Sequence, residues 1–481
     1  MSKITVLDTY QLNVNDIIID VSISIHEDEP VPIYAISITN ISDTTRIILD
    51  KIRDEFVASG IQRGSSDDIY GVQELFKENI LRLLAKYFPN ADRKTMDMLI
   101  NYILEQNIGL GNIEILLKDQ GLEEIVVNNA KEPLWVYHRK HGWLKTNVIM
   151  PSETRIRHYS TIIGRDVGKE ITILNPLMDA HLKTGDRVNS TLMPISSKGN
   201  TLTIRKFSTK PWTITDLLRE RTVSYEGAAL IWSAMQNELS IVVAGGTASG
   251  KTSMLNAIAN FFPPNQRILS VEDTRELQLP KMLHWVPMET RMPNPEGKGG
   301  VEMLDLIINT LRMRPDRILV GEIRRKKEAE VLFEAMHTGH SVYGTLHANN
   351  ARETVNRLTS PPIELPKQIL SAIGLIVVQN LNRRLGKRRT LQIAETTEDG
   401  DARVIMQYNA EKDGLDILNE PKTLIETLNL YTGMSKDQIF SDLQDKMKIL
   451  RWLVANNIND INKIGLIMSR YYRQSLKTAR V

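Results

Sequence analysis

Residues 241–252 read IVVAGGTASGKT, and this stretch decides the fold class. A short apolar run ends in a turn that carries Gly245, four further residues, and then Gly250, Lys251 and Thr252. Glycines let such a loop turn tightly and direct several backbone N–H groups at one anion. Lys251 can reach the β- and γ-phosphates of a nucleotide, and Thr252 can ligate Mg²⁺. The following residues have helical apolar spacing, so a helix N-terminus would also face the phosphates.

A chance glycine-rich loop is the alternative interpretation, because so short a pattern also arises by accident. The run before the loop reads as a strand and the segment SMLNAIANFF after it reads as a helix, which is the context that a phosphate-binding loop requires. We therefore predict a nucleotide site. Its loop residues are Gly245, Gly246, Thr247, Ala248, Ser249, Gly250, Lys251, Thr252 and Ser253.

The composition is that of an ordinary globular protein. The chain has 481 residues, of which 42% are hydrophobic and 25% charged, enough for two or three domains. A formal net charge of +2 implies no strong general attraction to nucleic acid or to an anionic membrane. The sequence contains no cysteine, which excludes disulfides, thiol catalysis and thiolate zinc sites, and fits a cytosolic location. We expect neither a signal peptide nor a membrane-spanning helix, so that any membrane role would run through a partner or a surface contact.

Changes in hydrophobic periodicity divide the chain into five segments. Alternating strands come first, followed by amphipathic helices and a polar linker around 60–71; an α+β module with a mostly antiparallel sheet comes next. Strands and helices then alternate, and the tail reads as helical. We predict an N-terminal strand and helix region (1–106), an α+β module (107–210), a hinge linker (211–223), a strand–helix domain around the phosphate loop (224–410) and a C-terminal helical region (411–481).

The strand–helix domain should contain a parallel sheet. Its strands are continuous apolar runs, which indicates a sheet covered by helices on both faces. A hairpin at 388–408, turning at Asp399, Gly400 and Asp401, should extend this sheet at one edge.

A phosphate loop also needs groups that organise magnesium and activate the attacking water. In a parallel sheet such groups lie at the carboxyl ends of neighbouring strands. Glu272 ends the run RILSVE, Asp273 follows it, and Glu322 follows the run RILVG. We predict that Glu322 binds a magnesium-bound water and that Glu272 orients or deprotonates the attacking water. The two roles could be exchanged, because sequence order gives no distances, and an acid here, above all Asp273, could instead cap the next helix.

Three histidines occur close together in the sequence, at His337, His340 and His347. A metal site is one interpretation, because His337 and His340 are spaced for ligation from one helix face. No acidic or further imidazole ligand shares that spacing, which disfavours it. His347 ends an apolar run at the sheet edge where a γ-phosphate should lie. We predict that His347 is a catalytic-site sensor that hydrogen-bonds phosphate, and that His337 is a structural helix residue.

Two arginines of the α+β module lie on short strands just before the hinge, Arg187 in GDRVN and Arg205 in TIRKF. Guanidinium groups on a neighbouring domain suit a charge clamp on a transferring phosphate. Further arginines near the candidate site, some of which we interpret as a solvated face or as structural pairs, are Arg312, Arg314, Arg324 and Arg325.

With these motifs in place, the sequence resembles the type II/type IV secretion-system ATPases, a superfamily that includes pilus assembly and retraction motors and the archaellum motor. GGTASGKT matches the Walker A motif of that family, and SVEDTREL at 270–277 matches its aspartate box. LRMRPDRILVGEIR at 311–324 matches the signature around Walker B, and GHSVYGTLHANN at 339–350 matches the histidine box. The stretch at 450–473 looks like the archaeal branch.

The resemblance implies a RecA-like P-loop ATPase domain and assigns roles to particular residues. It implies that Glu272 is the catalytic glutamate, that Glu322 is the Walker B glutamate, and that Arg187 and Arg205 contact nucleotide phosphates in the closed state. It further implies ATP and Mg²⁺ as cofactors, a cytoplasmic homo-hexamer at the inner face of the cell membrane, and a polytopic membrane platform protein of a pilus or archaellum system as partner. No nucleic-acid partner is expected.

The sequence also departs from the family. Arg325 stands where the signature usually continues with Asp, and the four-cysteine zinc insertion of the bacterial assembly branch is absent. The first hundred or so residues carry no matching motif. The alternative function is a nucleic-acid translocating ring ATPase, which the near-neutral charge disfavours. A binding module with an inactive phosphate loop has little support, because the expected lysine, threonine and both glutamates are present.

Overall fold

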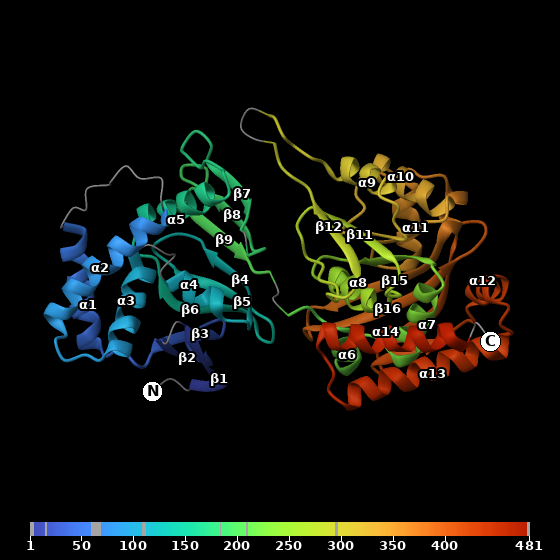
Figure 1. Cartoon of the computed structure of the whole chain (residues 1–481), viewed down its shortest axis with the longest axis horizontal. Helices are drawn as coiled ribbons and strands as arrows, with labels where there is room; N and C mark the ends of the chain where they lie inside the picture. Colours follow the sequence, from blue (N-terminus) through green and yellow to red (C-terminus); the bar gives the residue numbers. More distant parts are fainter. Residues whose placement is uncertain are drawn as a thin grey trace. The chain divides into compact units, whose positions relative to one another are not determined.

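The run that enters the predicted phosphate loop forms strand β10 (Ser240–Gly245), inside a nine-stranded sheet. This is seen in a computed structural model that describes residues 4–14, 17–58, 69–107, 112–182, 184–207, 210–293 and 297–478. The chain divides into two compact units, Met1–Ser208 and Thr209–Val481 (Figure 1). Most of the polar linker predicted around 60–71 lies outside the described residues.

The first unit holds a nine-stranded sheet and five helices among its described residues. In chain order its elements are β1 (Ile4–Val14), β2 (Ile17–His26), β3 (Ile33–Ile38), α1 (Asp43–Ala58), α2 (Ile69–Tyr87), α3 (Arg93–Asn107), α4 (Asn112–Lys118), β4 (Leu122–Val127), β5 (Pro133–His138), β6 (Gly142–Ile149), α5 (Glu153–Asp166), β7 (Leu177–His181), β8 (Arg187–Thr191) and β9 (Thr201–Arg205).

The boundary predicted at residue 106 is wrong as a boundary between compact units. The sheet runs in the order β1-β2-β3-β6-β5-β4-β9-β8-β7, so the first three strands extend the sheet of the α+β module. They join it through β3 and β6, which pair in parallel, whereas the other neighbours are antiparallel. Tyr34 of β3 is fully buried in the core that also holds Leu144 of β6. The sequence pattern predicted the strands of both segments. It did not predict that β3 pairs with β6, because such pairing depends on residues far apart in the chain.

The second unit carries the predicted strand–helix alternation. Its elements are α6 (Ile214–Arg219), α7 (Tyr225–Gln236), β10, α8 (Lys251–Ile258), the 3₁₀ helix η1 (Ala259–Phe261), β11 (Arg267–Glu272), β12 (His284–Glu289), α9 (Met303–Leu311), β13 (Arg317–Val320), α10 (Lys326–His337), β14 (Ser341–Leu346), α11 (Ala351–Thr359), η2 (Lys367–Ala372), β15 (Ile373–Asn382), β16 (Lys387–Thr396), β17 (Ala402–Asn409), β18 (Gly414–Ile417), α12 (Lys422–Thr432), α13 (Lys436–Ala455) and α14 (Ile461–Thr478).

The sheet of the second unit confirms the RecA-like α/β prediction. Its order is β12-β11-β13-β14-β10-β15-β16-β17-β18, in which the strands from β12 to β15 are mutually parallel and the remaining pairs are antiparallel. The phosphate-loop strand lies between β14 and β15, although both come later in the chain. The predicted edge hairpin is present as β16 and β17. Strands β12 and β18 at the two edges were not predicted.

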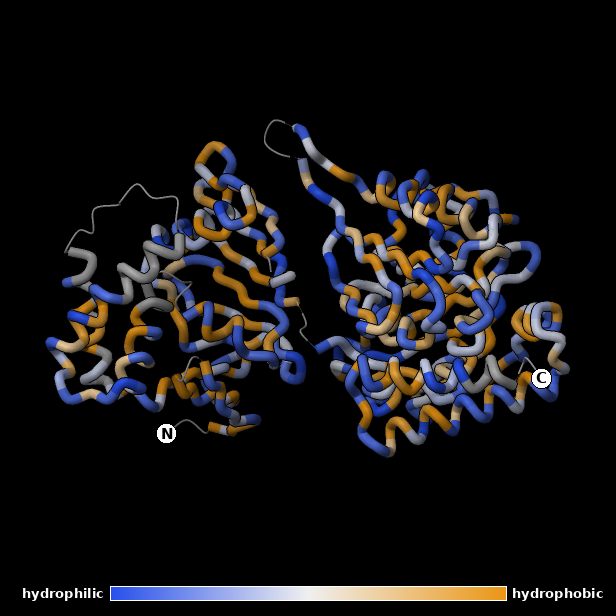
Figure 2. The backbone as a smooth tube through the Cα atoms, in the orientation of Figure 1, coloured by the Kyte–Doolittle hydropathy of each residue, from blue (hydrophilic) through white to orange (hydrophobic). Residues whose placement is uncertain are grey.

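Alternate residues of the parallel strands enter two separate cores. Ile241 and Val243 of β10 pack with helices α7, α8, α13 and α14, whereas Val242 and Ala244 pack with α9, α10 and α11. Figure 2 shows apolar residues gathered along these central strands, with hydrophilic residues over the outer helices and loops. Helices therefore cover both faces, which leaves the carboxyl edge of the sheet as the place where polar side chains can collect.

The segment 211–223, predicted as a hinge linker, is instead part of the second unit. Thr213 caps α6 in a capping box with Asp216, and Ile214, Leu217 and Leu218 are buried in the core. The division between the units falls at Ser208 and Thr209. The prediction failed because a six-residue amphipathic helix beside the pair Pro211-Trp212 gives too short a periodic signal.

The C-terminal region predicted as helical at 411–481 is helical from α12 onward but begins with strand β18, and it is not a separate body. Helices α13 and α14 share a core with α7 and α8. Tyr472 of α14 accepts a hydrogen bond from the indole nitrogen of Trp232 at 2.8 Å and donates one to the carbonyl of Phe261 at 2.5 Å. This ties the tail to the segment that leaves the phosphate-loop helix. None of the described helices combines the length and the apolar character needed to cross a bilayer.

Candidate functional site

The phosphate loop connects β10 to α8 in a conformation that its glycines make possible. A Cβ at Gly245 would lie 2.4 Å from Oγ of Ser249 and 2.6 Å from the carbonyl oxygen of Gln379, so no larger residue fits there. Gly250 adopts a φ of 91° and begins helix α8 without a side-chain cap in the described structure. The backbone N–H groups of the first turn of α8 therefore point toward the loop, as an anion site requires.

Hydrogen bonds within the loop stabilise its conformation. The hydroxyl of Ser249 donates to the carbonyl of Gly246 at 2.8 Å, and Nζ of Lys251 donates to the same carbonyl at 3.0 Å. Thr247 and Ala248 are exposed at the tip, whereas Thr252 and Ser253, in the first turn of α8, are partly buried. Desolvation lowers the pKa of Lys251, since its ammonium group is partly buried.

Glu272 ends β11 and is 1% exposed. Its Oε1 accepts the backbone N–H groups of Glu276 and Leu277 at 2.9 and 3.0 Å, whereas Oε2 is buried without a hydrogen-bond partner among the described residues. Burial raises the pKa of Glu272 to about 7, although the two backbone bonds favour the charged form. A carboxylate with an unused oxygen and a pKa near neutrality is suited to accept a proton.

Glu322 follows β13 and is held from two sides. Its Oε1 lies 3.2 Å from Nε2 of His347, and its Oε2 accepts a hydrogen bond from Nη2 of Arg324 at 2.7 Å. The other terminal nitrogen of Arg324 donates to Oδ2 of Asp273 at 2.5 Å. Desolvation, followed by the charge of Lys251, lowers the pKa of His347.

These contacts form a charged row along the carboxyl edge of the sheet. The row runs Lys251, His347, Glu322, Arg324 and Asp273, and Nζ of Lys251 lies 3.4 Å from both ring nitrogens of His347. Its members follow β10, β14, β13 and β11, four strands that are neighbours in that order. The structure thus brings Lys251, Glu322 and His347 together as one site beside the phosphate loop.

The other two histidines do not join this site. His337 is exposed at the end of α10. His340 precedes β14, and its Nδ1 lies 3.3 Å from the carbonyl of Ala335. His347 follows the same strand, so about 20 Å of extended chain separates it from His340. Within the described ranges, no group of three or more His, Cys, Asp or Glu residues is arranged to hold a metal ion.

The donor set at the phosphate loop suits Mg²⁺ bound mainly by nucleotide and water. Thr252 offers a hydroxyl oxygen at the start of α8, and Glu322 offers a carboxylate in the middle of the charged row. Mg²⁺ prefers hard oxygen ligands and keeps several waters when it is held with substrate phosphates. A site with few protein oxygens therefore fits Mg²⁺ better than it fits an ion that needs a cage of protein ligands.

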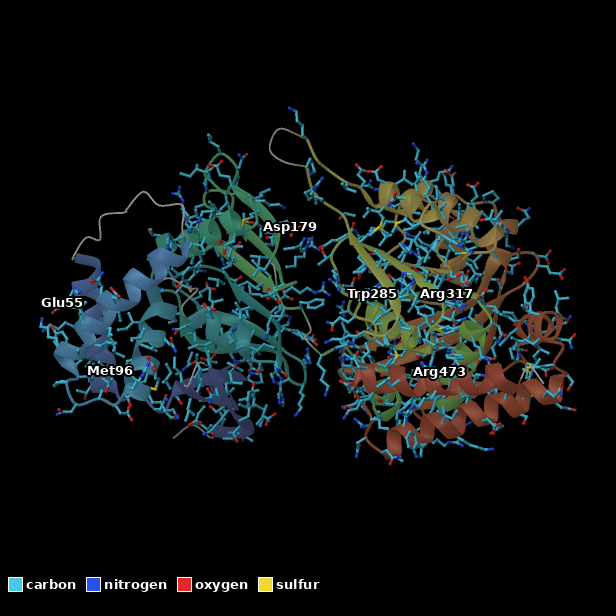
Figure 3. The ribbon with its side chains drawn as sticks, viewed as in Figure 1. Glu55, Met96, Asp179, Trp285, Arg317 and Arg473 are labelled. Carbon is cyan, nitrogen blue, oxygen red and sulfur yellow. The ribbon has the colours of Figure 1, made fainter. Side chains whose placement is uncertain are left out.

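Arg187 and Arg205 lie in the first unit, directly opposite each other on β8 and β9. Arg187 makes a two-point contact with Asp179 of β7, which is labelled in Figure 3, with N···O distances of 3.0 and 2.6 Å. Two guanidinium groups on facing positions of neighbouring strands repel each other unless an anion lies near both. The register thus makes them a pair, which the sequence did not predict.

Sequence reasoning missed Arg388. It lies on β16, and its Nε donates to the carbonyl of Ala248 in the phosphate loop at 3.0 Å. Ala248 has a φ of 61°, and a Cβ at Gly250 would lie 3.4 Å from Cδ of Arg388, so this side chain packs across the outside of the loop. The sequence signal that could have indicated this contact is the run of three cations at 387–389. These residues lie on β16, which pairs with β15, the neighbour of β10.

Two cavities lie beside Arg389, the residue that follows Arg388 on β16. They measure about 180 and 150 Å³ and share Arg389, Tyr408 and Asp413. Arg389 and Asp413 form a two-point ion pair with N···O distances of 2.7 and 2.8 Å. Neither of these two cavities is lined by a phosphate-loop residue.

A family model described as "Type II/IV secretion system protein" matches residues 179–457. An uncharacterised protein of Methanocaldococcus jannaschii is 35% identical over 389 residues, which cover 78% of this chain and 70% of that protein. The type IV secretion system protein PtlH of Bordetella pertussis is 30% identical over 307 residues, covering 57% of this chain and 89% of that protein. The X-ray structure of the Legionella pneumophila ATPase DotB aligns with a TM-score of 0.44 at 20% identity, covering 74% of this chain and 94% of that one.

Proposed function

The chain belongs to the type II/IV secretion system protein family, and we propose that it is an ATPase that hydrolyses Mg²⁺-bound ATP to ADP and phosphate. The observation that carries the proposal is the charged row beside the phosphate loop. Lys251, His347 and Glu322 converge there within 3.4 Å of their neighbours, at the N-terminus of helix α8. Fixed charges placed where a phosphoryl group is transferred are the main source of catalysis for this reaction.

The two glutamates take different roles in this proposal. Glu272 is buried and has an unused oxygen, so it accepts a proton from the attacking water. Glu322 is more exposed and already contacts Arg324 and His347 with its two oxygens, and in this proposal it holds a water of the magnesium shell together with Thr252. Bound Mg²⁺ would neutralise charge on the β- and γ-phosphates. His347 lies between Lys251 and Glu322, which suits a sensor of the terminal phosphate.

The first unit contributes the charge clamp in this proposal. Arg187 and Arg205 face each other on adjacent strands, and they would contact the phosphates when the two units close on the nucleotide.

We further propose that the chain works as a homo-hexameric motor in the cytoplasm, at the inner face of the cell membrane. It would transmit force to a polytopic membrane platform protein that assembles a pilus-like or archaellum-like filament, or serves secretion. PtlH, a type IV secretion system protein, is a relative that supports the secretion context. A nucleic-acid translocating ring ATPase is the alternative outcome.

The test is ATP hydrolysis by the full chain, measured as phosphate release with and without Mg²⁺. We expect Mg²⁺-dependent turnover that Lys251→Ala abolishes while the oligomeric state, measured by light scattering, is unchanged. Anionic lipid vesicles and single-stranded DNA are then compared as activators. Stimulation by vesicles supports the secretion motor, whereas many-fold stimulation by DNA alone supports the alternative. Near-normal turnover of Lys251→Ala would reject the assignment of the site.

A further inference from the structure

Both carboxylate oxygens of Glu322 have protein partners in the second unit. Oε1 lies 3.2 Å from His347, and Oε2 accepts a hydrogen bond from Arg324 at 2.7 Å. A hydrated Mg²⁺ at this carboxylate would therefore meet the guanidinium group of Arg324, which is bound to the same carboxylate. Two cations that share one carboxylate repel each other, so the contact with Arg324 competes with the ion.

We propose that Arg324 is a positioning residue that acts as an internal counter-cation: before Mg²⁺ binds it bridges Glu322 and Asp273, and when Mg²⁺ binds it releases Glu322 and keeps Asp273 alone. This inference rests on the proposed function, because it takes Glu322 as the carboxylate on the magnesium side. It goes beyond that function by naming the group that Mg²⁺ must displace.

Arg324 has a second acceptor ready for this exchange. Its Nη1 donates to Oδ2 of Asp273 at 2.5 Å while its Nη2 donates to Glu322, so the two contacts use different nitrogens. Asp273 follows β11 and Glu322 follows β13, which are adjacent strands. The guanidinium can therefore release Glu322 and remain paired, and the exchange leaves neither the cation nor Asp273 without a partner.

The contact is exposed enough to be displaced. The side chains of Arg324 and Asp273 are 57% and 44% exposed, whereas that of Glu322 is 19% exposed. Exposed ion pairs are weak, because water screens them and two long side chains lose freedom. Removing the competing cation should therefore change the apparent affinity for Mg²⁺ by roughly two- to tenfold, and not by several orders of magnitude.

The experiment measures binding and does not depend on turnover. The equilibrium dissociation constant of AMP-PNP for the full chain is determined by calorimetry over a range of free Mg²⁺, which gives the Mg²⁺ concentration at half effect. The variants are Arg324→Gln, Arg324→Lys and Asp273→Asn. The matched control is Arg325→Gln, which removes the same charge at the next position, where the arginine is 71% exposed and pairs with Glu302 at 3.2 Å. Thermal melting checks that each variant is folded.

The proposal predicts opposite shifts for the two partners. Arg324→Gln lowers the half-effect Mg²⁺ concentration about two- to tenfold, whereas Arg324→Lys and Arg325→Gln stay within about twofold of the parent chain. Asp273→Asn raises it, because Arg324 loses its alternative acceptor. In the double variant Arg324→Gln/Asp273→Asn, the effect of Asp273→Asn is largely lost.

Two results would overturn the proposal. One is an unchanged or raised Mg²⁺ requirement in Arg324→Gln. The other is an Asp273→Asn effect of the same size with and without Arg324, which would indicate general electrostatics in place of an exchange. If the parent chain binds AMP-PNP without any dependence on Mg²⁺, the proposed function itself fails, and the two failures are thus distinguishable.

Discussion

Arg388 donates a hydrogen bond from its Nε to the carbonyl of Ala248 at 3.0 Å, across 140 residues of sequence. Ala248 holds a left-handed conformation with a φ of 61°, which costs a non-glycine residue free energy unless its surroundings impose it. The antiparallel hairpin of β15 and β16 therefore restrains the tip of the phosphate loop. The loop is shaped by its own sequence and also by this distant side chain.

Replacement of Arg388 by Ala should weaken nucleotide binding by about two- to tenfold, the value of one hydrogen bond that orders a loop. The effect should appear in the dissociation constant of ADP, measured by calorimetry, and in KM more than in kcat. Arg384→Ala is the control, because Arg384 is exposed at the turn of the same hairpin. Equal losses in both variants would mean that the general positive charge of the hairpin, and not the contact with Ala248, supports binding.

The fit of Gly245 against its neighbours gives a steric prediction. A Cβ there would meet Ser249 at 2.4 Å and the backbone of Gln379 at 2.6 Å, and a backbone oxygen of a paired strand cannot move aside easily. Gly245→Ala should cost about 1–3 kcal/mol of unfolding free energy and abolish nucleotide binding. Chemical unfolding measures the first effect. Gly414→Ala is the comparison, because its added Cβ would meet only the carbonyl oxygen of Lys412, at 3.8 Å; a similar loss of binding there would contradict the steric explanation.

The site was predictable from the sequence as far as strand ends determine it. Lys251, Glu322 and His347 each follow an apolar run, and the carboxyl ends of parallel strands meet at one edge, so their grouping needed no distances. Arg388 escaped prediction because its place depends on the register of an antiparallel hairpin, in which Leu381 pairs with Arg388. The pairing of β3 with β6 was not predicted for a similar reason. It involves two residues on each strand, and so short a parallel contact between distant segments produces no pattern in the local sequence.

The raised pKa of Glu272 predicts a pH dependence of the rate. A general base works in its deprotonated form, so hydrolysis at saturating ATP should rise with pH through about 7 and then level off. Glu272→Gln should reduce kcat by at least about a hundredfold while ADP still binds, because the amide cannot accept the proton. A variant that kept the rise in rate across this range would assign the titration to another group.

The same shift predicts that Glu272 costs stability at alkaline pH. Its pKa is raised from 4.5 to about 7 on folding, so the folded state binds the proton more tightly than the unfolded state. Stability from this group is fully present below about pH 4.5 and is lost as the pH rises through about 7. Glu272→Gln should therefore exceed the parent chain in unfolding free energy by roughly 1–3 kcal/mol at pH 8. Urea unfolding at pH 5 and pH 8 measures this, and an equal difference at both pH values would contradict it.

The docking of the C-terminal helix depends on the hydroxyl of Tyr472, which joins Trp232 and Phe261 in the interior. Tyr472→Phe keeps the ring but leaves the indole N–H of Trp232 and the carbonyl of Phe261 without this partner. An unsatisfied buried polar group costs about 1–3 kcal/mol, so we expect the variant to unfold at lower urea. Because Phe261 ends the segment that leaves the phosphate-loop helix, nucleotide should protect the variant less than the parent chain. Tyr471→Phe is the control, since the hydroxyl of Tyr471 makes a longer 3.3 Å contact with Asp442. Equal losses of stability in the two variants would show that the effect is not specific to the hydroxyl of Tyr472.

The pairing of Arg187 with Arg205 across β8 and β9 gives the test of the clamp. If both guanidinium groups stabilise charge on the transferred phosphate, Arg187→Ala and Arg205→Ala should each reduce kcat at least about tenfold, and the double variant should lose less than the product of the two effects. ADP affinity should change little, because the phosphate loop provides most of the binding. Arg157→Ala, at an exposed position of α5, is the control for loss of positive charge in the first unit. Phosphate release under single-turnover conditions measures the chemical step, and loss of ADP binding in step with kcat would indicate a role in binding instead of a clamp.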